Sequence, residues 1–160
     1  MSKYSLGAGD VKEEGFISVD LSDKCGADIV ADVRVFPWDW MEDGAEMIMS
    51  KNLLEHLSVD ERAKFFNEAH RKMKVGGILY TLVPLAISPN DSLEDLKAHL
   101  MAALTDPTHK TFFTTQSFDY LDIDHQRGKI YGRDYGFSLW KRTRNEEFNK
   151  RFLIVELVKV

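Results

Sequence analysis

The stretch Tyr4-Ser5-Leu6-Gly7-Ala8-Gly9-Asp10, closely followed by Phe16-Ile17-Ser18-Val19-Asp20, decides the fold. It predicts a short strand, a glycine turn and a second strand that ends in an acid. The two glycines let the backbone approach a ligand closely because they carry no Cβ. An acid at the tip of the next strand can accept hydrogen bonds from ribose hydroxyls. We therefore expect Gly7, Gly9 and Asp20 to hold a nucleoside-containing ligand at the carboxyl edge of a parallel sheet.

The connection between these two strands is unusually short. Only residues 10–14 separate the glycine pair from Gly15. A full crossover helix between parallel strands needs about a dozen residues or more. We expect a single turn or an irregular loop there, so the first crossover helix is reduced or absent.

Further along, the apolar pattern alternates between strands and helices. Ser58 and Glu61 form a capping box, and the helix that they start is predicted to end at Gly76-Gly77. A second helix, over residues 92–104, has Leu93, Leu96, Leu100 and Leu104 on one side, which indicates a core-facing stripe. A short helix is expected at residues 117–121. Strands are predicted at residues 27–32, 45–50 and 78–83, the last stopped by Pro84, and at 137–140 and 152–158, joined by the polar segment 144–150. This order predicts an α/β fold with a mainly parallel sheet, an antiparallel C-terminal hairpin and a single domain over residues 1–160.

Composition restricts the class of protein. The 160 residues carry a formal net charge of -5 and no dense basic run, which argues against a nucleic-acid backbone as partner, apart from a local patch at residues 141–144. Cys25 is the single cysteine, so no internal disulfide can form and a cytoplasmic location is expected. Neither a signal peptide nor a membrane span is visible.

These motifs together resemble the class I S-adenosylmethionine-dependent methyltransferases, and most closely a compact branch related to the type 11 family. The resemblance covers the chain to about Phe118. It rests on the motifs at residues 6–9, 15–20, 27–32, 52–57, 73–79 and 106–109, the last followed by Phe112-Phe113-Thr114. It implies a Rossmann-like fold and S-adenosylmethionine as cofactor.

The resemblance also implies roles for single residues. Gly7 and Gly9 would pack against the methionine part of the cofactor, and Asp20 would hold the ribose hydroxyls. Asp32 and Val33 would face adenine. The segment after the fourth strand would line the cofactor and acceptor pocket, with Asn52, Leu53 and His56. The sequence departs from the family in two places: Tyr4 and Ser5 replace the acid before the glycine motif, and the first helix is missing.

Two histidines are candidates for catalysis. His56 can remove a proton from an acceptor hydroxyl or amine near neutral pH, or it can simply pack at the start of the Ser58 helix. Asp106 and His109 lie in a loop that could cover the acceptor, although Asp-Pro is also an ordinary turn signal. The five histidines show no spacing typical of a metal site, so no metal is expected.

The predicted function is methyl transfer to an O or N atom of a small-molecule or surface acceptor. The alternative is a degenerate, non-catalytic member of the fold that acts as a binding or regulatory subunit. A nucleic-acid methyltransferase is a weaker third reading, because it would need a basic face. The missing first helix and the small size also make a homo-oligomer or a partner subunit possible, since a partner could complete the pocket.

Overall fold

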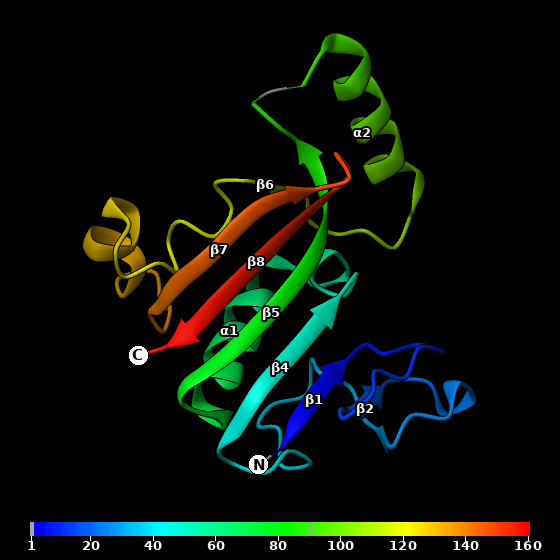
Figure 1. The fold of residues 1–160 in the computed structure, drawn as a ribbon, viewed down its shortest axis with the longest axis vertical. Helices are drawn as coiled ribbons and strands as arrows, with labels where there is room; N and C mark the ends of the chain where they lie inside the picture. The colour runs from blue at the N-terminus through cyan, green and yellow to red at the C-terminus, as the bar shows by residue number, and fades with distance from the viewer. Residues whose placement is uncertain (1, 90) are drawn as a thin grey trace.

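A computed structural model describes residues 2–89 and 91–160. Their strands form one mixed sheet in the order β3-β2-β1-β4-β5-β8-β7, with β6 paired to β5 off this path (Figure 1). The strands are β1 (Lys3–Leu6), β2 (Ile17–Asp20), β3 (Ile29–Val30), β4 (Ala45–Lys51), β5 (Met73–Ile87), β6 (Phe113–Thr114), β7 (Trp140–Phe148) and β8 (Phe152–Lys159). The helices are α1 (Val59–Lys72) and α2 (Leu93–Thr105), with 3₁₀ turns at Asp23–Cys25 and Leu54–His56 and a π-helical turn at Gly128–Gly132.

Pairing is parallel from β3 through β5 and antiparallel for β5 with β8 and β8 with β7. The predicted α/β class, with its antiparallel C-terminal hairpin, is therefore confirmed. The chain between β1 and β2 contains no helix, so the prediction of a reduced or absent first crossover helix is also confirmed. The turn instead closes on β2, where Gly7 N donates to the Val19 carbonyl at 2.9 Å.

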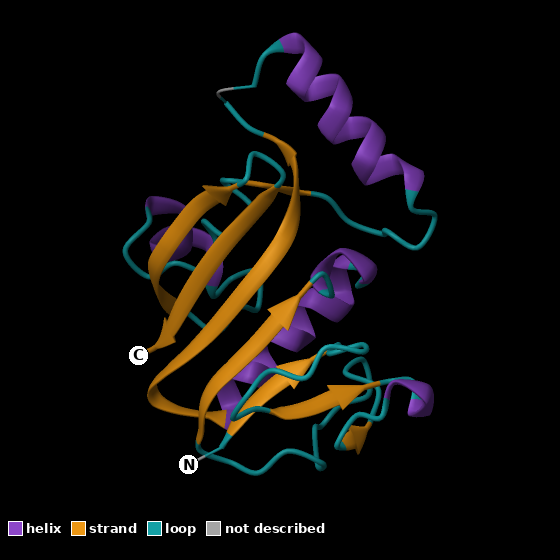
Figure 2. Cartoon of the chain, turned by 45° about the vertical axis from the view of Figure 1, so that its right-hand side comes forward, coloured by secondary structure: helices purple, strands orange, loops and turns teal. Residues whose placement is uncertain are grey.

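Helix α1 covers one face of the sheet (Figure 2). Its capping box forms as predicted: Glu61 N donates to Ser58 Oγ at 3.3 Å, and Ser58 N donates to Glu61 Oε2 at 2.7 Å. Phe65 and Ala69 are fully buried against the strands. Trp38, from the loop after β3, packs on the Phe65 ring at a centroid distance of 5.2 Å and is fully buried, so it closes the core rather than lining a pocket.

Strand β5 is longer than predicted at both ends. Helix α1 ends at Lys72, and the chain enters the sheet at Met73 before reaching the two glycines. Gly76 has a φ of +78°, and the register with β4 shifts nearby, so the glycines make an irregularity inside the strand instead of a helix end. Pro84 does not stop the strand. Leu85 N donates to the carbonyl of Arg151, the residue before β8, so the proline nitrogen points to the other side, beyond the end of β4.

The leucine stripe of α2 does not face the core. Leu93 and Leu104 are 68% and 64% exposed, and the buried positions are instead His99 and Ala103. The helix lies past the end of β5 and contacts it (Figure 1). The prediction of a helix from the spacing of the leucines is confirmed, but the prediction that the leucines face the core is wrong.

In the C-terminal third of the chain, three predicted elements differ from the structure. Residues 117–121 form turns rather than a helix, and a helical segment occurs later, around Gly128–Gly132. Residues 137–139 are irregular, and β7 instead takes in most of the polar segment that was expected to be a loop. The hairpin turn contains Asn149 and Lys150, whose φ angles are +51° and +57°. Positive φ at both central positions matches the twist of an antiparallel pair.

Candidate functional site

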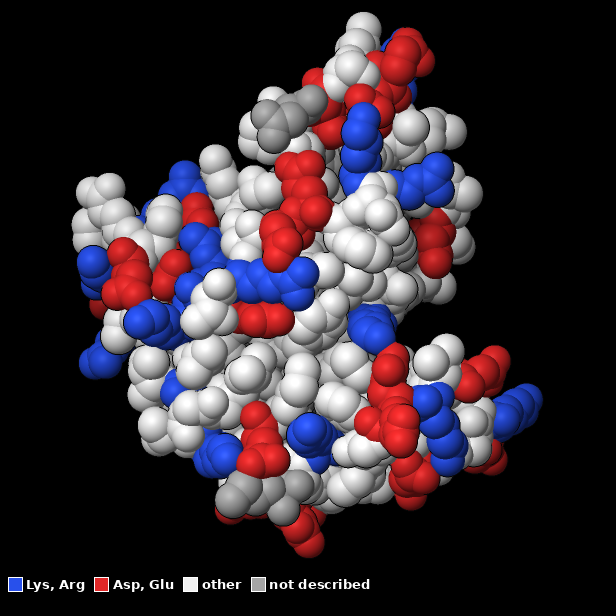
Figure 3. All heavy atoms as spheres, viewed as in Figure 1, with Lys and Arg blue, Asp and Glu red and all other residues white. Residues whose placement is uncertain are grey.

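A pocket of about 290 Å³ lies where β1, β2, β3 and β4 end. Figure 3 shows the surface hollowed on this side of the molecule, below α2. The lining residues are Gly7, Asp20, Leu21, Ala31, Asp32, Val33, Arg34, Asn52, Leu53, His56 and Leu57. Six of the seven predicted cofactor residues are among them, and Gly9 is the exception. The pocket occupies the position between β1 and β4 where the strand order reverses, which is the usual ligand site of open α/β sheets.

Gly7 forms the floor of this pocket. Its φ of +65° is a left-handed conformation that side chains rarely adopt, and an added Cβ would lie 3.0 Å from Leu53 Cδ1. The backbone of the turn and the Leu53 side chain are therefore packed in contact. The left-handed conformation favours glycine here, and a Cβ would require the Leu53 side chain to shift by a few tenths of an ångström.

Asp20 is held by backbone amides on both of its oxygens. Gly9 N donates to Oδ2 and Ser22 N donates to Oδ1, each at 2.9 Å. Burial opposes ionisation of this carboxyl, but the donors from Ser22 and Gly9 outweigh it and lower its pKa. A carboxylate oxygen can accept a second hydrogen bond, so Asp20 stays ionised and free to bind hydroxyls in the pocket. Gly9 thus acts on the site through Asp20 rather than by lining it.

Asp32 forms a bidentate ion pair with Arg34. The guanidinium donates from Nε at 2.8 Å and from Nη2 at 2.7 Å, and this contact lowers the pKa of the carboxyl. Arg34, Leu21, Ala31 and Leu57 line the pocket but were missed from the sequence. Each directly precedes or follows a predicted site residue in the sequence, and this adjacency is the signal that could have identified it.

Asn52 follows β4 in a left-handed conformation with a φ of +49°. Its N–H donates to the Leu82 carbonyl at 2.9 Å, which fixes this strained residue at the end of the strand. Asparagine tolerates such a conformation better than most residues, and strain of this kind is frequent at binding sites.

The fold brings together the two predicted catalytic histidines, which are far apart in sequence. The rings of His56 and His109 lie edge to face with centroids 5.0 Å apart. The loop that carries His109 is shaped by Asp106, whose carboxylate accepts from Thr108 N at 2.8 Å and from Thr108 Oγ1 at 2.6 Å. His109 also lines a second cavity of about 530 Å³ between α2 and the β7–β8 turn, while His56 lines the first pocket.

Glu55 was not predicted, yet it is the most unusual group at this site. It is only 2% exposed, and Oε2 has no hydrogen-bond partner among the described residues. Burial raises its pKa, against the opposing effects of its own backbone N–H and of His56 and His109. Glu55, His56 and His109 each offer a ligand atom within 4.8 Å of the others. The sequence signal for Glu55 is its position directly beside His56, inside the predicted lining segment.

Solved structures show what the chain resembles. A methyltransferase dependent on S-adenosylmethionine from Archaeoglobus fulgidus superposes with a TM-score of 0.63 at 17% identity, covering 99% of this chain and 86% of that one. One from Mesorhizobium loti gives 0.63 at 16% identity, with coverages of 98% and 90%. The chain has the class I methyltransferase fold. A Haloferax volcanii methyltransferase-like protein, solved in complex with the activator Trm112, matches this fold with a TM-score of 0.65 at 13% identity, covering 99% and 81%. No family model and no curated protein matches the sequence.

Two further predictions concern the surface of this class I fold. In the basic patch, Arg142 pairs with Asp119 at 2.9 Å, and Arg144 pairs with Glu146 and Glu156, so these charges are already compensated. Acidic and basic side chains are interspersed on the face drawn in Figure 3. Across residues 2–89 and 91–160, no helix has the length and apolar character needed to cross a membrane.

Proposed function

We propose that the protein is an S-adenosylmethionine-dependent methyltransferase that acts on an O or N atom of a small-molecule or surface acceptor. The observation that carries this proposal is the convergence of Gly7, Asp20, Asp32 and Asn52 on one pocket, at the strand reversal of a class I methyltransferase fold. Bound there, the cofactor supplies an electrophilic methyl group. The structural neighbours named above support the choice of cofactor.

The residues present suit that cofactor. Gly7 lines the pocket and carries no side chain, so a ligand can approach its backbone closely. We assign Gly7, Asn52 and Leu53 to the methionine part and Asp20 to the ribose hydroxyls. Asp32 and Val33 are assigned to adenine. The two acids are ionised at neutral pH, and Asp20 retains accepting capacity beyond its amide partners.

The second cavity is the candidate site for the acceptor. His56 contributes to the first pocket and His109 to the second, and the two rings are in contact. A histidine in this position can accept the proton that an acceptor hydroxyl or amine loses. Holding the acceptor and the methyl donor in line supplies much of the rate by itself.

Calorimetry with S-adenosylhomocysteine tests the cofactor assignment. We expect one site per chain, and we expect Asp20→Ala to weaken binding by about tenfold to hundredfold, since a hydrogen bond to a charged group is worth about 1.5–3 kcal/mol. Asp23→Ala, an exposed acid outside the pocket, is the matched control and should bind like the wild type. No heat from folded wild-type protein at millimolar ligand refutes the proposal, and equal losses in both variants refute the role of Asp20.

A non-catalytic binding subunit is the second candidate. It is favoured by the helix-free connection from β1 to β2, because a helix N-terminus there would add amide donors and a favourable dipole. The Haloferax neighbour, solved with an activator, is a precedent for a member of this fold that works with a partner. Cofactor binding without methyl transfer to any acceptor in a chemically diverse panel would favour this candidate. Transfer of a labelled methyl group would exclude it.

A further inference from the structure

We propose that Glu55, His56 and His109 form a binding site for a divalent transition-metal ion such as Zn²⁺ or Co²⁺. Two imidazoles and one carboxylate are a common ligand set for such ions, with positions left open for water or substrate. Ligand atoms around a bound ion lie about 2.0–2.2 Å from it, and therefore roughly 3–4 Å from one another. The three candidate atoms already lie within 4.8 Å, so small side-chain movements would close the site.

The Glu55 carboxylate is the independent sign of a ligand. A buried polar group without a partner is costly, and such groups are rare in folded proteins. Glu55 Oε2 is shielded from solvent and accepts no hydrogen bond from the described residues, and a carboxylate oxygen of Glu55 lies within 4.8 Å of a ring nitrogen of each histidine. A cation between the carboxylate and the rings would satisfy this oxygen.

Both histidines are oriented in the way that metal ligands require. The His56 Nδ1 atom lies 3.3 Å from the Thr108 carbonyl and 3.0 Å from Thr108 Oγ1, whose own hydrogen goes to Asp106. The His109 Nδ1 atom lies 3.0 Å from the Ala103 carbonyl. Carbonyls only accept, so each Nδ1 carries the proton and each Nε2 has a free lone pair. Metal-bound histidines are typically fixed by hydrogen bonds of this kind.

The two chain segments are also locked together. Lys110 N and Thr111 N donate to the Glu55 carbonyl at 2.8 and 3.1 Å, and Thr111 Oγ1 donates to the Leu54 and Leu57 carbonyls. The cluster is therefore built on a fixed backbone frame. Asp106 Oδ2 lies 3.7 Å from His109 Nε2, so it can act as a further oxygen ligand or compete with the ion for that ring.

The place of the cluster suggests its use. His56 lines the first pocket and His109 lines the second, so an ion here would lie between the proposed cofactor and acceptor sites. With both Nε2 lone pairs on the ion, the histidines would not act as bases. A divalent ion in that position would instead polarise an acceptor oxygen and lower the pKa of its hydroxyl. This role rests on the proposed function, whereas binding of the ion does not.

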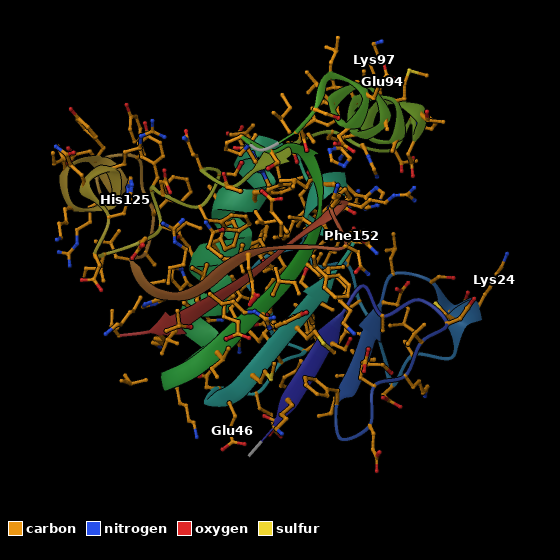
Figure 4. The ribbon with its side chains drawn as sticks, turned by 45° about the horizontal axis from the view of Figure 1, so that its top comes forward. Lys24, Glu46, Glu94, Lys97, His125 and Phe152 are labelled. Carbon is orange, nitrogen blue, oxygen red and sulfur yellow. The ribbon has the colours of Figure 1, made fainter. Side chains whose placement is uncertain are left out.

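Titration of metal-free, untagged protein with Co²⁺ tests the site, because its visible absorption reports coordination by nitrogen and oxygen ligands. We expect one ion per chain, displaced by Zn²⁺. Glu55→Gln and His109→Ala should each weaken Co²⁺ binding at least about hundredfold. Thr108→Val removes the hydroxyl that lies between His56 Nδ1 and Asp106 but keeps the Thr108 carbonyl, and it should weaken binding about tenfold. His125→Ala is the matched control, because His125 lies in the segment beside β7 (Figure 4) and its ring contacts Asp119 outside the cluster. It should bind like the wild type.

A thermal-shift measurement separates a metal ligand from a merely structural residue. Wild-type protein should melt at a higher temperature with Zn²⁺, while Glu55→Gln should lose this shift and, without metal, be at least as stable as the wild type. No Co²⁺ binding at millimolar concentration, or binding unchanged in both Glu55→Gln and His109→Ala, overturns the site. If the wild-type protein binds Co²⁺ but does not bind S-adenosylhomocysteine, the proposed function alone is refuted and the metal site stands.

Discussion

Gly7 shows how a single residue can serve both the fold and the site. Its φ of +65° is equal to that of Gly26, but only at Gly7 would a Cβ meet a neighbour, Leu53. We expect Gly26→Ala to lower the free energy of unfolding by about 1 kcal/mol, from the left-handed conformation alone. Gly7→Ala should cost about 2 kcal/mol and also weaken S-adenosylhomocysteine binding. Urea unfolding and calorimetry measure the two effects, and equal behaviour of the variants would contradict the role of Leu53.

Asp28 predicts a dependence of stability on pH. The Ser18 hydroxyl donates to its carboxylate at 2.6 Å and Ser18 N at 2.8 Å, and these bonds, with Lys12, lower the pKa of Asp28. Because the pKa of Asp28 is lower in the folded state, ionised Asp28 stabilises the protein at pH values above the pKa of the unfolded state, near 3.9. This stabilisation is lost as the pH falls toward the folded-state pKa. Asp28→Ala should therefore melt at a lower temperature than the wild type at pH 7, with the difference shrinking toward pH 2.

Asp28→Asn serves as the control for this prediction, because it keeps a hydrogen-bonding group at the same place but cannot ionise. Its melting temperature should fall between those of the wild type and Asp28→Ala at pH 7. A deficit of Asp28→Ala that stays constant across the pH range would show that the ionised carboxylate is not the cause.

At the scale of elements, the two main helices start with the same device but differ in how firmly they are attached. Ser58 and Ser92 each cap a helix within a capping box. Helix α1 buries Phe65 and Ala69 in the core, whereas α2 leaves most of its leucines exposed. Figure 4 shows Glu94 and Lys97 of α2 well away from the sheet. We infer that α2 is the less stable element and can open without unfolding the rest.

The matched pair Ser58→Ala and Ser92→Ala tests this difference. Loss of the Ser58 cap should lower the global free energy of unfolding by about 1 kcal/mol, since α1 is part of the core. Loss of the Ser92 cap should leave the global value within about 0.3 kcal/mol and speed hydrogen exchange only in α2. If both variants lower the global free energy of unfolding equally, α2 unfolds together with the rest of the protein.

At the scale of the whole molecule, a buried ion-pair cluster ties the segment before β7 to the sheet. Arg142 contacts Asp119 at 2.9 Å and Asp122 at 3.2 Å, and all three side chains are nearly buried. Removing one partner of a buried pair leaves an uncompensated charge, which costs about 3–5 kcal/mol. We expect Arg142→Met to lower the free energy of unfolding, measured in urea, by about 3 kcal/mol. This is the low end of the range, because Arg127 and His125 remain near Asp119.

Arg127→Met is the control for this cluster. Arg127 lies 3.5 Å from Asp119 but is 45% exposed, and solvent-exposed pairs contribute little. Its cost should stay below about 1 kcal/mol. Similar costs for the two arginines would show that proximity to Asp119, rather than burial, decides the contribution.

The sequence was most informative where signal and structure are both local. The capping box at Ser58, the strand ends at Gly7 and Asp20, and the short link between them could be predicted because adjacent residues determine them. Predictions failed where burial depends on distant partners. The leucines of α2 have helical period, but the period does not say which side meets β5. Likewise, Pro84 stays in its strand only because β4 has already ended beside it.

By itself, the sequence determined the glycine turn, the acids at the strand ends and the succession of most strands along the chain, since each depends on a few consecutive residues. Only the tertiary structure decided that these ends share one pocket and that Glu55 and His56 meet His109. That meeting comes from two segments docked through the Glu55 carbonyl and the amides of Lys110 and Thr111. No spacing in the chain encodes such a contact, because it is created by the packing of elements that are remote in sequence.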